Sequence, residues 1–587
     1  MKDRKGFTLV ELLAVIAILA ILVIIALPNV LNMYIKARKS AFLTETKNIY
    51  KEAEKKFISG NITNTDVKVI DSENDSKLDM TGEKLKYCIV LDSRGKVELL
   101  KASNGKYVIE VSKDEDIANV DIDRITEGNL DDYKCNGVVP PKATNCTYDG
   151  ELVQGAEFVQ GKFTYRYMQE GKLVRDGKSL DWQNIATDGW GVQLTDKTST
   201  DPVVAETCTY INDKPVVSAA NMFSKSQASS IDMSKMNTSN IISFEATFIS
   251  TTATSINMKN MDTSSGITFS AMFESAKAES LDVSNFDTSN ATDMSYMFNY
   301  TLATEINGVK NLDTSNVINM GWMFAGTKLK NIDLSTLNTK KVKYMYGMFY
   351  NSAFESLDLS KFDTSNVINM GWMFFGSKAT DINLSNFNTK NVISMERMFQ
   401  SSLVNSIDLT NFDTSNVINM IFMFCDAQAK SINLSTLNTS KVVNMYGMFW
   451  EAEATSIDLS NFDTSNVTDM SYMFRDAKFT KLDVSNFNTK KVKSMLQMFN
   501  RTAATEIIGL TNFDTTSVDN MQYMFNVSNA KVLDLSSFDI TNTSNIKYMF
   551  NGSKSKIGYA RDEETVAKFS DKSVTSIPST LKFSVKK

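Results

Sequence analysis

The side chains that most often carry chemistry are scarce or scattered in this chain of 587 residues. It contains no histidine, so it can form no histidine-based triad, no imidazole general base and no histidine-ligated zinc or haem site. None of its five cysteines belongs to a CxxC pair of the kind that binds zinc. No pair of nucleophile and base stands out in residues 136–215, and no other group of residues indicates catalysis. We therefore expect no enzyme, no metal site and no cofactor.

The charge balance argues against a nucleic-acid partner. The chain has 62 Lys and Arg residues against 68 Asp and Glu residues, for a net charge of −6, and no long basic run. Proteins that bind nucleic acid concentrate positive charge on one face. We expect no nucleic acid to bind this chain.

One acidic residue, Glu11, stands inside an apolar segment. Residues 7–27 read FTLVELLAVIAILAILVIIAL, with that single charge. As a helix they would span about 30 Å, enough to cross a bilayer, and Lys2, Arg4 and Lys5 would hold the preceding end in the cytoplasm. We expect one crossing of a bacterial cell membrane, with the bulk of the chain outside. Glu11 then needs a partner, because an acidic residue costs roughly 2.5–3.5 kcal/mol near the centre of a membrane helix, and less near its end, where Glu11 lies.

The run Gly6-Phe7-Thr8-Leu9-Val10-Glu11, followed by apolar residues and Pro28, resembles the prepilin cleavage and methylation segment of type IV pilins and type II secretion pseudopilins. The resemblance implies that a prepilin peptidase cuts between Gly6 and Phe7 and methylates the new amino terminus. It also implies that Glu11 pairs with the terminal amine of a neighbouring pilin or pseudopilin subunit. A plain signal anchor is the alternative.

The next residues predict a pilin-like region. Residues 1–6 would be a leader peptide and 7–58 one long helix, whose outer half places Ile35, Phe42, Ile49, Ala53 and Phe57 near one face. Three short runs, KYCIVLD, KVELLKA and KYVIEVS, predict strands of a small sheet. We assign that β region to residues 59–135.

Four cysteines outside the membrane allow three disulfide pairings. We favour the local pairing, which joins Cys88 to Cys135 and Cys146 to Cys208; buried free thiols are the alternative. Cys425 is expected to be a lone, partly exposed thiol.

Residues 136–215 predict a small antiparallel β module connecting the pilin-like region to the rest of the chain. Aromatic and β-branched residues alternate there with glycine-containing turns. Trp182 and Trp190 are predicted to form its core, and a sugar-binding platform is the alternative.

From Phe223 onward a phenylalanine recurs every 25 residues, with two steps of 26 beside Gly308 and Gly509. A bulge could absorb each added residue. Within each unit, apolar and polar residues first alternate along a short stretch, as in a strand. Apolar residues then follow at the spacing of a helix. We predict an α/β solenoid of 14 coils over residues 216–552, each coil a strand plus a short helix, with a terminal cap over 553–587.

Residues 456–474 represent the repeat and read SIDLSNFDTSNVTDMSYMF. Val467, Met470, Met473 and Phe474 are predicted to form the apolar face of the short helix, and Thr464 to be its N-cap. The repeat resembles BspA-like leucine-rich repeats of bacterial surface proteins. That resemblance implies binding and adhesion, and it brings no catalytic residues.

Two columns of the solenoid are candidate binding faces. An acidic row on the strands consists of Asp333, Asp358, Asp408, Asp458 and Asp483. This row could bind Ca²⁺ or sugar hydroxyls, or could simply be solvated. An aromatic column is predicted opposite the core face of the helices, at Tyr296, Trp322, Trp372, Phe422, Tyr472, Tyr523 and Tyr548. An exposed aromatic row often marks a binding surface, and lateral packing between short helices is the alternative.

Aspartate and asparagine alternate in the turns of successive coils, as at Asp363 and Asn388. Stacked aspartates about 5 Å apart would repel one another. Asparagine and Lys340, Lys390 or Lys490 in the intervening coils are expected to relieve that repulsion.

The sequence therefore predicts a cell-surface adhesion protein. It would be a minor or tip pilin-like subunit displaying a leucine-rich repeat solenoid to an unidentified host protein, glycan or other cell-surface ligand. The alternative is a pseudopilin of a type II secretion or DNA-uptake machine, whose solenoid contacts the other parts of that machine.

Overall fold

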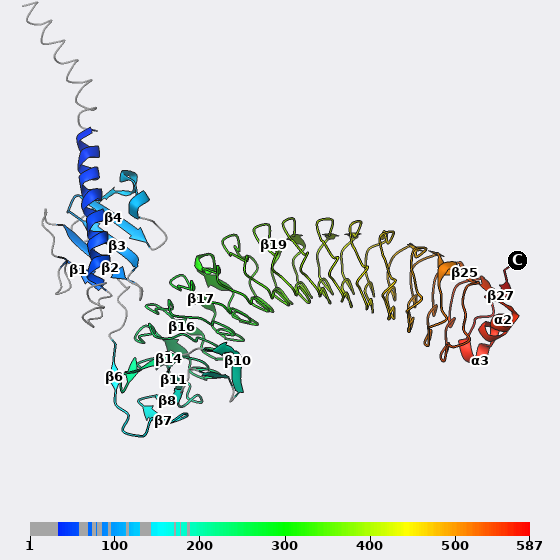
Figure 1. Ribbon diagram of the computed structural model, residues 1–587, viewed down its shortest axis with the longest axis horizontal. Helices are drawn as coiled ribbons and strands as arrows, with labels where there is room; N and C mark the ends of the chain where they lie inside the picture. The colour runs from blue at the N-terminus through cyan, green and yellow to red at the C-terminus, as the bar shows by residue number, and fades with distance from the viewer. Residues whose placement is uncertain are drawn as a thin grey trace, which may run out of the picture. The chain divides into compact units, whose positions relative to one another are not determined.

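The computed structural model describes residues 33–57, 69–72, 78, 85–91, 96–112, 117–128, 143–168, 172–175, 178–184 and 188–586. The chain divides into two compact units, Met1–Pro141 and Lys142–Lys587 (Figure 1). The segment predicted to cross the membrane, residues 7–27, lies outside the described residues. Among the helices that are described, none is long and apolar enough to span a membrane.

The first unit packs a helix against an antiparallel sheet. Residues 33–57 are helical, and Phe42, Ile49, Ala53 and Phe57 are buried in one cluster with side chains of the sheet, whereas Ile35 is only half-buried. The sheet contains the three predicted strands and two further short ones, all antiparallel, in the order β1 (Val69–Asp71), β2 (Lys86–Leu91), β3 (Val97–Ser103), β4 (Tyr107–Ser112) and β5 (Thr126–Glu127). Two 3-10 turns, Ile117–Asn119 and Ile122–Arg124, lie between β4 and β5.

The second unit begins with a mixed sheet. Its strand order is β6 (Asn145–Cys146), β13 (Tyr210–Ile211), β14 (Lys214–Ser218), β11 (Gly189–Leu194), β8 (Phe163–Met168) and β7 (Glu157–Gln160). The pairs β6–β13 and β11–β14 are parallel, so the prediction of a purely antiparallel module is wrong. Strands β9 (Lys172–Arg175) and β10 (Lys178–Asn184) form a separate antiparallel pair, and Trp182 lies on β10.

Trp190 is the centre of this module. It is fully buried, and its ring lies edge-on to those of Tyr148 and Phe158 at 5.4 and 5.5 Å between centroids. A disulfide joins Cys146 to Cys208, with the two Cα atoms 5.8 Å apart. Cys88 of the first unit is also disulfide-bonded, and Cys135 lies outside the described residues.

The same module closes the N-terminal end of the solenoid. Phe163 lies edge-on to Phe223 of the first coil, and Leu194 N donates to Met222 O at 2.9 Å. The apolar core continues without a break from Trp190 through all the coils. The module is therefore a cap whose core is shared with the repeats.

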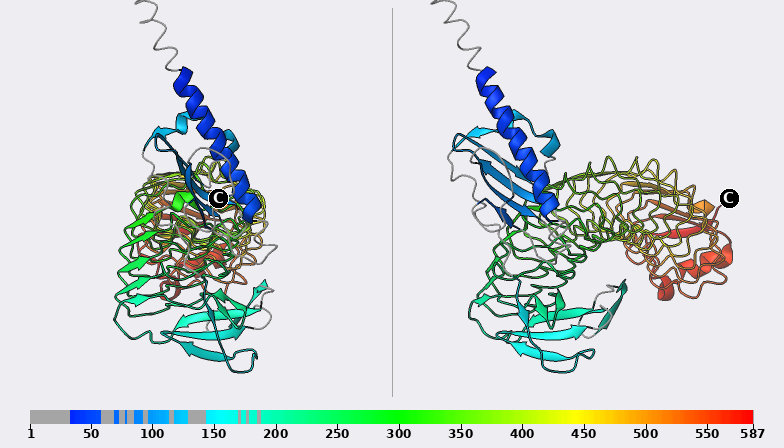
Figure 2. Two further views of the ribbon diagram at one scale, coloured as in Figure 1. Left: turned by 90° about the vertical axis from the view of Figure 1, so that its left-hand side faces the viewer. Right: turned by 60° about the vertical axis from the view of Figure 1, so that its left-hand side comes forward.

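The rest of the unit is a β-solenoid of about 16 turns. On one side, parallel bridges join each coil to the next without interruption from Ser218 to Asn545. The coils lie one behind another, so equivalent residues form columns along the stack (Figure 2).

On the other side, short parallel strands pair in small groups. The groups are β12 (Val203–Val204) with β15 (Ser230–Asp232) and β16 (Ser255–Asn257); β17 (Ser280–Asp282) with β18 (Glu305–Asn307); β19 (Ser356–Asp358) with β20 (Asp381–Asn383); β21 (Ser406–Asp408) with β22 (Ser431–Asn433); and β23 (Lys481–Asp483) with β24 (Glu506–Ile508). The coils are therefore bridged continuously on one side and paired only in groups on the other. The solenoid curves along its length (Figure 1).

The described residues 216–552 contain no α-helix. The segment predicted to be a short helix in each coil forms turns instead. Val467, Met470, Met473 and Phe474 are fully buried as predicted, but Met473 N donates to Met470 O, three residues back, in a tight turn. The N–H groups of Met470 and Phe474 donate to the next coil, at Ser494 O and Met498 O. Successive tight turns also bring residues three apart to one side, which explains why the apolar spacing imitated a helix.

Thr464 is therefore no N-cap. It is fully buried, its Oγ1 donates to Asn488 O in the next coil at 3.0 Å, and it accepts from Asn488 N at 2.8 Å. Equivalent threonines donate to the next coil in the same way: Thr314, Thr339, Thr364, Thr389, Thr414, Thr439, Thr489 and Thr515. We call this column the threonine ladder.

The two added residues enter 3-10 turns, not bulges. Gly308 and Gly509 have φ of 86° and 91°, and each is followed by a 3-10 turn, η5 (Val309–Asn311) or η6 (Leu510–Asn512). A Cβ atom on Gly308 would lie 2.3 Å from Ser284 Cα. Glycine is therefore required there both by the left-handed backbone and by the close approach of the preceding coil.

The C-terminal residues close the other end of the stack. Strands β25 (Val532–Leu535), β26 (Ile557–Ala560) and β27 (Lys582–Val585) form a parallel sheet, and helices α2 (Glu563–Ser570) and α3 (Lys572–Thr575) lie beside it. Asp562 caps α2 by accepting from Thr565 N. Phe569 and Phe583 both contact Phe550, the last phenylalanine of the repeat.

Candidate binding face

The aromatic column occupies a backbone position with unusual geometry. Its seven residues, Tyr296, Trp322, Trp372, Phe422, Tyr472, Tyr523 and Tyr548, all have φ between 55° and 61°. This left-handed region costs a residue with a Cβ atom roughly 1–2 kcal/mol. Intervening coils place Gly347, Arg397, Gly447 and Gln497 at the same position with the same sign of φ. The turn imposes the conformation, and the aromatic side chains are present in spite of it.

The rings of the column pack against neighbours that the sequence did not single out. Tyr296 and Trp322 are stacked, with centroids 6.1 Å apart and planes 9° apart. Tyr350 lies 4.8 Å from Trp322 and 4.8 Å from Phe375. Tyr350 and Phe375 each follow the closing phenylalanine of a coil directly. The recurrence of aromatic residues at that second position, which Trp450 also occupies, is the signal that could have identified them.

Two arginines complete the row. The Arg397 guanidinium lies 4.6 Å from the centroid of the Trp372 ring and 4.4 Å from that of Phe422. Arg475 lies 4.6 Å from the centroid of the Trp450 ring in the same way. Stacking between a guanidinium and an aromatic face is attractive by about 0.5–2 kcal/mol.

We call this row the aromatic ridge: Tyr296, Trp322, Tyr350, Trp372, Phe375, Arg397, Phe422, Trp450, Tyr472 and Arg475. Every member is half-buried, and the Arg397 side chain is 26% exposed. Tyr523 and Tyr548 form a separate stacked pair with centroids 4.9 Å apart. The predicted column is therefore a laterally packed ridge whose side chains are partly exposed to solvent.

The acidic row on the strand side does not converge on a common point. Each of Asp333, Asp358, Asp408, Asp458 and Asp483 is exposed and accepts the backbone N–H of the residue two positions later, at 2.9–3.0 Å. Among the described residues there is no group of three or more His, Cys, Asp or Glu side chains that could hold a metal ion. The row stabilises its own turns.

The turn aspartates are stabilised mainly by local hydrogen bonds. Bonds from the side chain and backbone of Ser365 lower the pKa of Asp363, and the charge of Lys340 in the preceding coil lowers it further. Asp413 is stabilised in the same way by Ser415 and Lys390. The lysines of the intervening coils therefore favour the charged aspartates, as expected, but their effect is the smaller one.

Cys425 is a free thiol with only 6% of its surface exposed. Burial raises the pKa of this thiol to about 12. The expectation of a partly exposed cysteine is therefore wrong, because the residue after the closing phenylalanine lies against neighbouring coils.

The processing residues Gly6 and Phe7 and the assembly residue Glu11 lie outside the described residues. Residues 1–27, which contain all three, match the prokaryotic N-terminal methylation motif. The match confirms the resemblance seen in the sequence.

The repeats match a second family, described as "Mycoplasma protein of unknown function, DUF285", at residues 217–307, 300–406, 403–508 and 481–571. No curated protein and no solved structure matches the chain.

Proposed function

The chain belongs to the DUF285 family and carries a prokaryotic N-terminal methylation motif, and from this premise we propose that it is a pilin-like surface subunit that displays its solenoid for adhesion. The resemblance of the coils to the leucine-rich repeats of bacterial surface proteins also supports a role in adhesion. We propose a minor or tip position, because a large solenoid on every subunit would crowd a filament.

The observation that carries the proposal is the methylation motif at residues 1–27 joined to a long repeat array in one chain. The motif implies processing by a prepilin peptidase and assembly with other pilins. The helix and five-stranded sheet of the first unit support a pilin-like stem. Within the described residues, the long curved stack offers extended surfaces of the kind that repeat proteins use for binding.

Replacement of Glu11 by valine tests the pilin role. We expect Glu11→Val to be processed but to lose incorporation into filaments, because the glutamate would no longer pair with the terminal amine of a neighbouring subunit. Leu12→Val, an apolar change in the same segment, is the matched control. Filament fractions probed with an antibody against the solenoid give the measurement, and unchanged incorporation of Glu11→Val would contradict the pilin role.

Display and adhesion are tested separately. Intact cells labelled with the same antibody should show surface signal, and deletion of the whole second unit, residues 142–587, should reduce attachment to target cells. An absence of surface signal would refute the adhesion proposal.

A pseudopilin is the second candidate, because pseudopilins carry the same kind of amino-terminal segment. In that case the solenoid would contact parts of a secretion or DNA-uptake machine. Loss of secretion or of DNA uptake on deletion of the gene, with no surface label on intact cells, would favour this alternative.

A further inference from the structure

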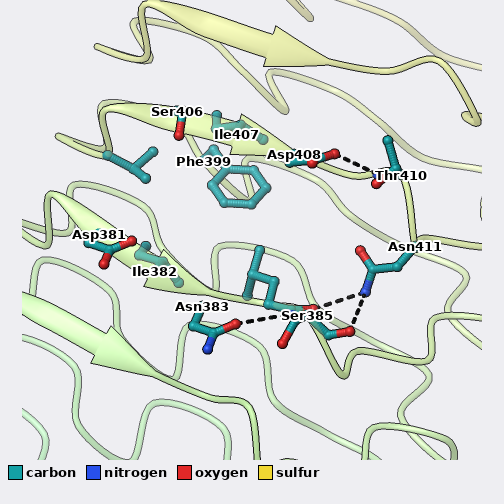
Figure 3. Close-up of a pocket in the computed structure, with 12 residues that line it drawn as sticks. Asp381, Ile382, Asn383, Ser385, Phe399, Ser406, Ile407, Asp408, Thr410 and Asn411 are labelled. Atoms are coloured by element: carbon teal, nitrogen blue, oxygen red, sulfur yellow. Dashed lines mark hydrogen bonds between the residues drawn. The ribbon is translucent and has the colours of Figure 1, made fainter.

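A cavity opens on the strand side of the solenoid, between β20 and β21. Strand β20 pairs with β19, and β21 pairs with β22, but β20 and β21 do not pair with each other. The space between them has a volume of about 510 Å³ (Figure 3). That volume lies within the range of about 300–1,000 Å³ typical of small-molecule pockets.

Both ends of this opening are closed by bonds between the two coils. Just before the strands, Asn405 N donates to Thr380 O at 3.0 Å. Just after them, the Asn411 side-chain amide donates to Leu384 O at 2.9 Å and to Phe387 O at 3.3 Å. The open stretch is three residues long, or about 10 Å at 3.3 Å per residue.

The closed ends decide which kind of ligand fits. An extended peptide adding itself as a strand would have to continue past both ends, where the coils are already bonded. A compact ligand needs only the open stretch. The geometry therefore favours a small molecule or one or two units of a polymer over an inserted peptide strand.

The floor of the cavity is apolar and its rim is polar. Ile382, Leu384, Phe399 and Ile407 line the floor, and the Phe399 ring lies between the two strands (Figure 3). The lining includes no lysine or arginine, so phosphate, sulfate and acidic sugars find no cationic partner there.

Three rim groups have hydrogen-bonding capacity to spare. Neither the Asp381 carboxylate nor the Ser406 hydroxyl has a hydrogen bond or an ion pair with any described residue. The Asp408 carboxylate accepts from Thr410 N through one oxygen, which leaves the other for a ligand. The three groups stand on the two facing strands, so they could bind hydroxyl groups from both sides.

We propose that this cavity binds a neutral saccharide. The C–H face of a sugar ring would lie toward the apolar floor, and its hydroxyls would donate to Asp381 and Asp408 and bond with Ser406. This inference rests on the proposed adhesion function and assigns it a ligand class and a place.

The test uses the full chain, solubilised in detergent, on an array of neutral, sialylated and sulfated glycans. The pocket variant combines Asp381→Ala with Asp408→Asn. Asparagine keeps the oxygen that accepts the local N–H, as Asn383 and Asn433 do at the same position of other coils. The matched control is Asp458→Asn, which changes an equivalent aspartate that does not line the cavity.

We expect the unchanged chain to bind one or more neutral glycans, the pocket variant to bind them at least tenfold more weakly, and Asp458→Asn to bind as before. Equal melting temperatures of the three proteins show that folding is retained. Equal affinity of the pocket variant, binding of sialylated or sulfated glycans only, or no glycan binding at all would each overturn the proposal.

The cell assays separate this proposal from the adhesion function. If the pocket variant binds the array as the unchanged chain does and cells that display it attach normally, the saccharide site is refuted and adhesion is left intact. A chain that is never displayed on cells would refute adhesion, while the purified protein on the array still decides about the cavity.

Discussion

At the residue scale, the aromatic ridge combines an unfavourable backbone conformation with favourable stacking of its side chains. Trp372 has a φ of 61°, and its ring is contacted by Phe375 and by the guanidinium of Arg397. Gly347 and Gly447 occupy the same turn position without strain. The ridge is therefore stabilised by stacking at a position where backbone sterics alone would select glycine.

A pair of substitutions at Trp372 separates these two effects. Trp372→Ala and Trp372→Gly both remove the ring, so their difference isolates the backbone conformation. We expect the glycine variant to be more stable than the alanine variant by about 1 kcal/mol, the reverse of the order found in ordinary backbone regions. Chemical denaturation of both variants provides the comparison. An alanine variant of equal or greater stability would show that the left-handed turn is not retained.

At the element scale, the unit of the structure is a coil bonded to its successor. The threonine ladder places one buried hydroxyl in each coil from Thr314 to Thr515, where it bonds the turn of the next coil. An N-cap would hydrogen-bond backbone N–H groups of its own helix. Each hydroxyl of the ladder instead hydrogen-bonds backbone groups of the next coil. Its energetic effect is therefore on stacking.

Thr464→Val tests the ladder. Valine matches the shape of threonine but leaves the N–H and C=O of Asn488 without this partner, at an expected cost of roughly 1–3 kcal/mol in the free energy of unfolding. The control is Thr455→Val, because Thr455 is exposed and its hydroxyl is not part of the ladder. If Thr464→Val and Thr455→Val have the same stability, the hydroxyl contributes nothing to stacking.

At the scale of the whole molecule, lowered carboxyl pKa values recur along the stack. The affected turn and strand aspartates include Asp333, Asp358, Asp363, Asp413, Asp458, Asp463, Asp483, Asp514 and Asp539. Hydrogen bonds from Thr541, with a smaller contribution from Arg561, lower the pKa of Asp539 to about 2.

The sign of the pH dependence follows from these shifts. A carboxyl group whose pKa is lower in the folded chain binds fewer protons there than in the unfolded chain, so stability rises with pH. The contribution is fully present above the ordinary aspartate pKa of about 3.9. It is lost as the pH falls through the lower, folded values.

We accordingly expect the melting temperature to fall between pH 4 and pH 2. The triple variant Asp363→Asn, Asp413→Asn, Asp463→Asn should flatten that dependence, because asparagine makes the same turn at Asn388 and Asn438 and does not titrate in this range. Thermal melts across this pH range measure the slope, with pH 7 as the reference. An unchanged slope in the triple variant would show that these carboxyls do not govern acid unfolding.

Much of the organisation follows from the sequence alone. The recurrence of phenylalanine every 25 residues determined a solenoid, because a repeated apolar pattern can be buried only by stacking. The spacing of Phe42, Ile49, Ala53 and Phe57 likewise predicted a helix with one apolar face, and such a face must pack against an apolar surface. The amino-terminal motif was readable because its chemistry depends on a contiguous run of residues from Gly6 to Glu11.

Only the tertiary structure decided how each coil is built. Residues three apart face one side in a helix and also across tight turns, so spacing could not distinguish the two. The sequence predicts a cap at Thr464, but the partner of Thr464 lies 24 residues later in the chain. The aromatic ridge and the cavity between β20 and β21 depend likewise on which coils meet and how closely. These relations arise from contacts between coils, and a pattern along one coil does not contain them.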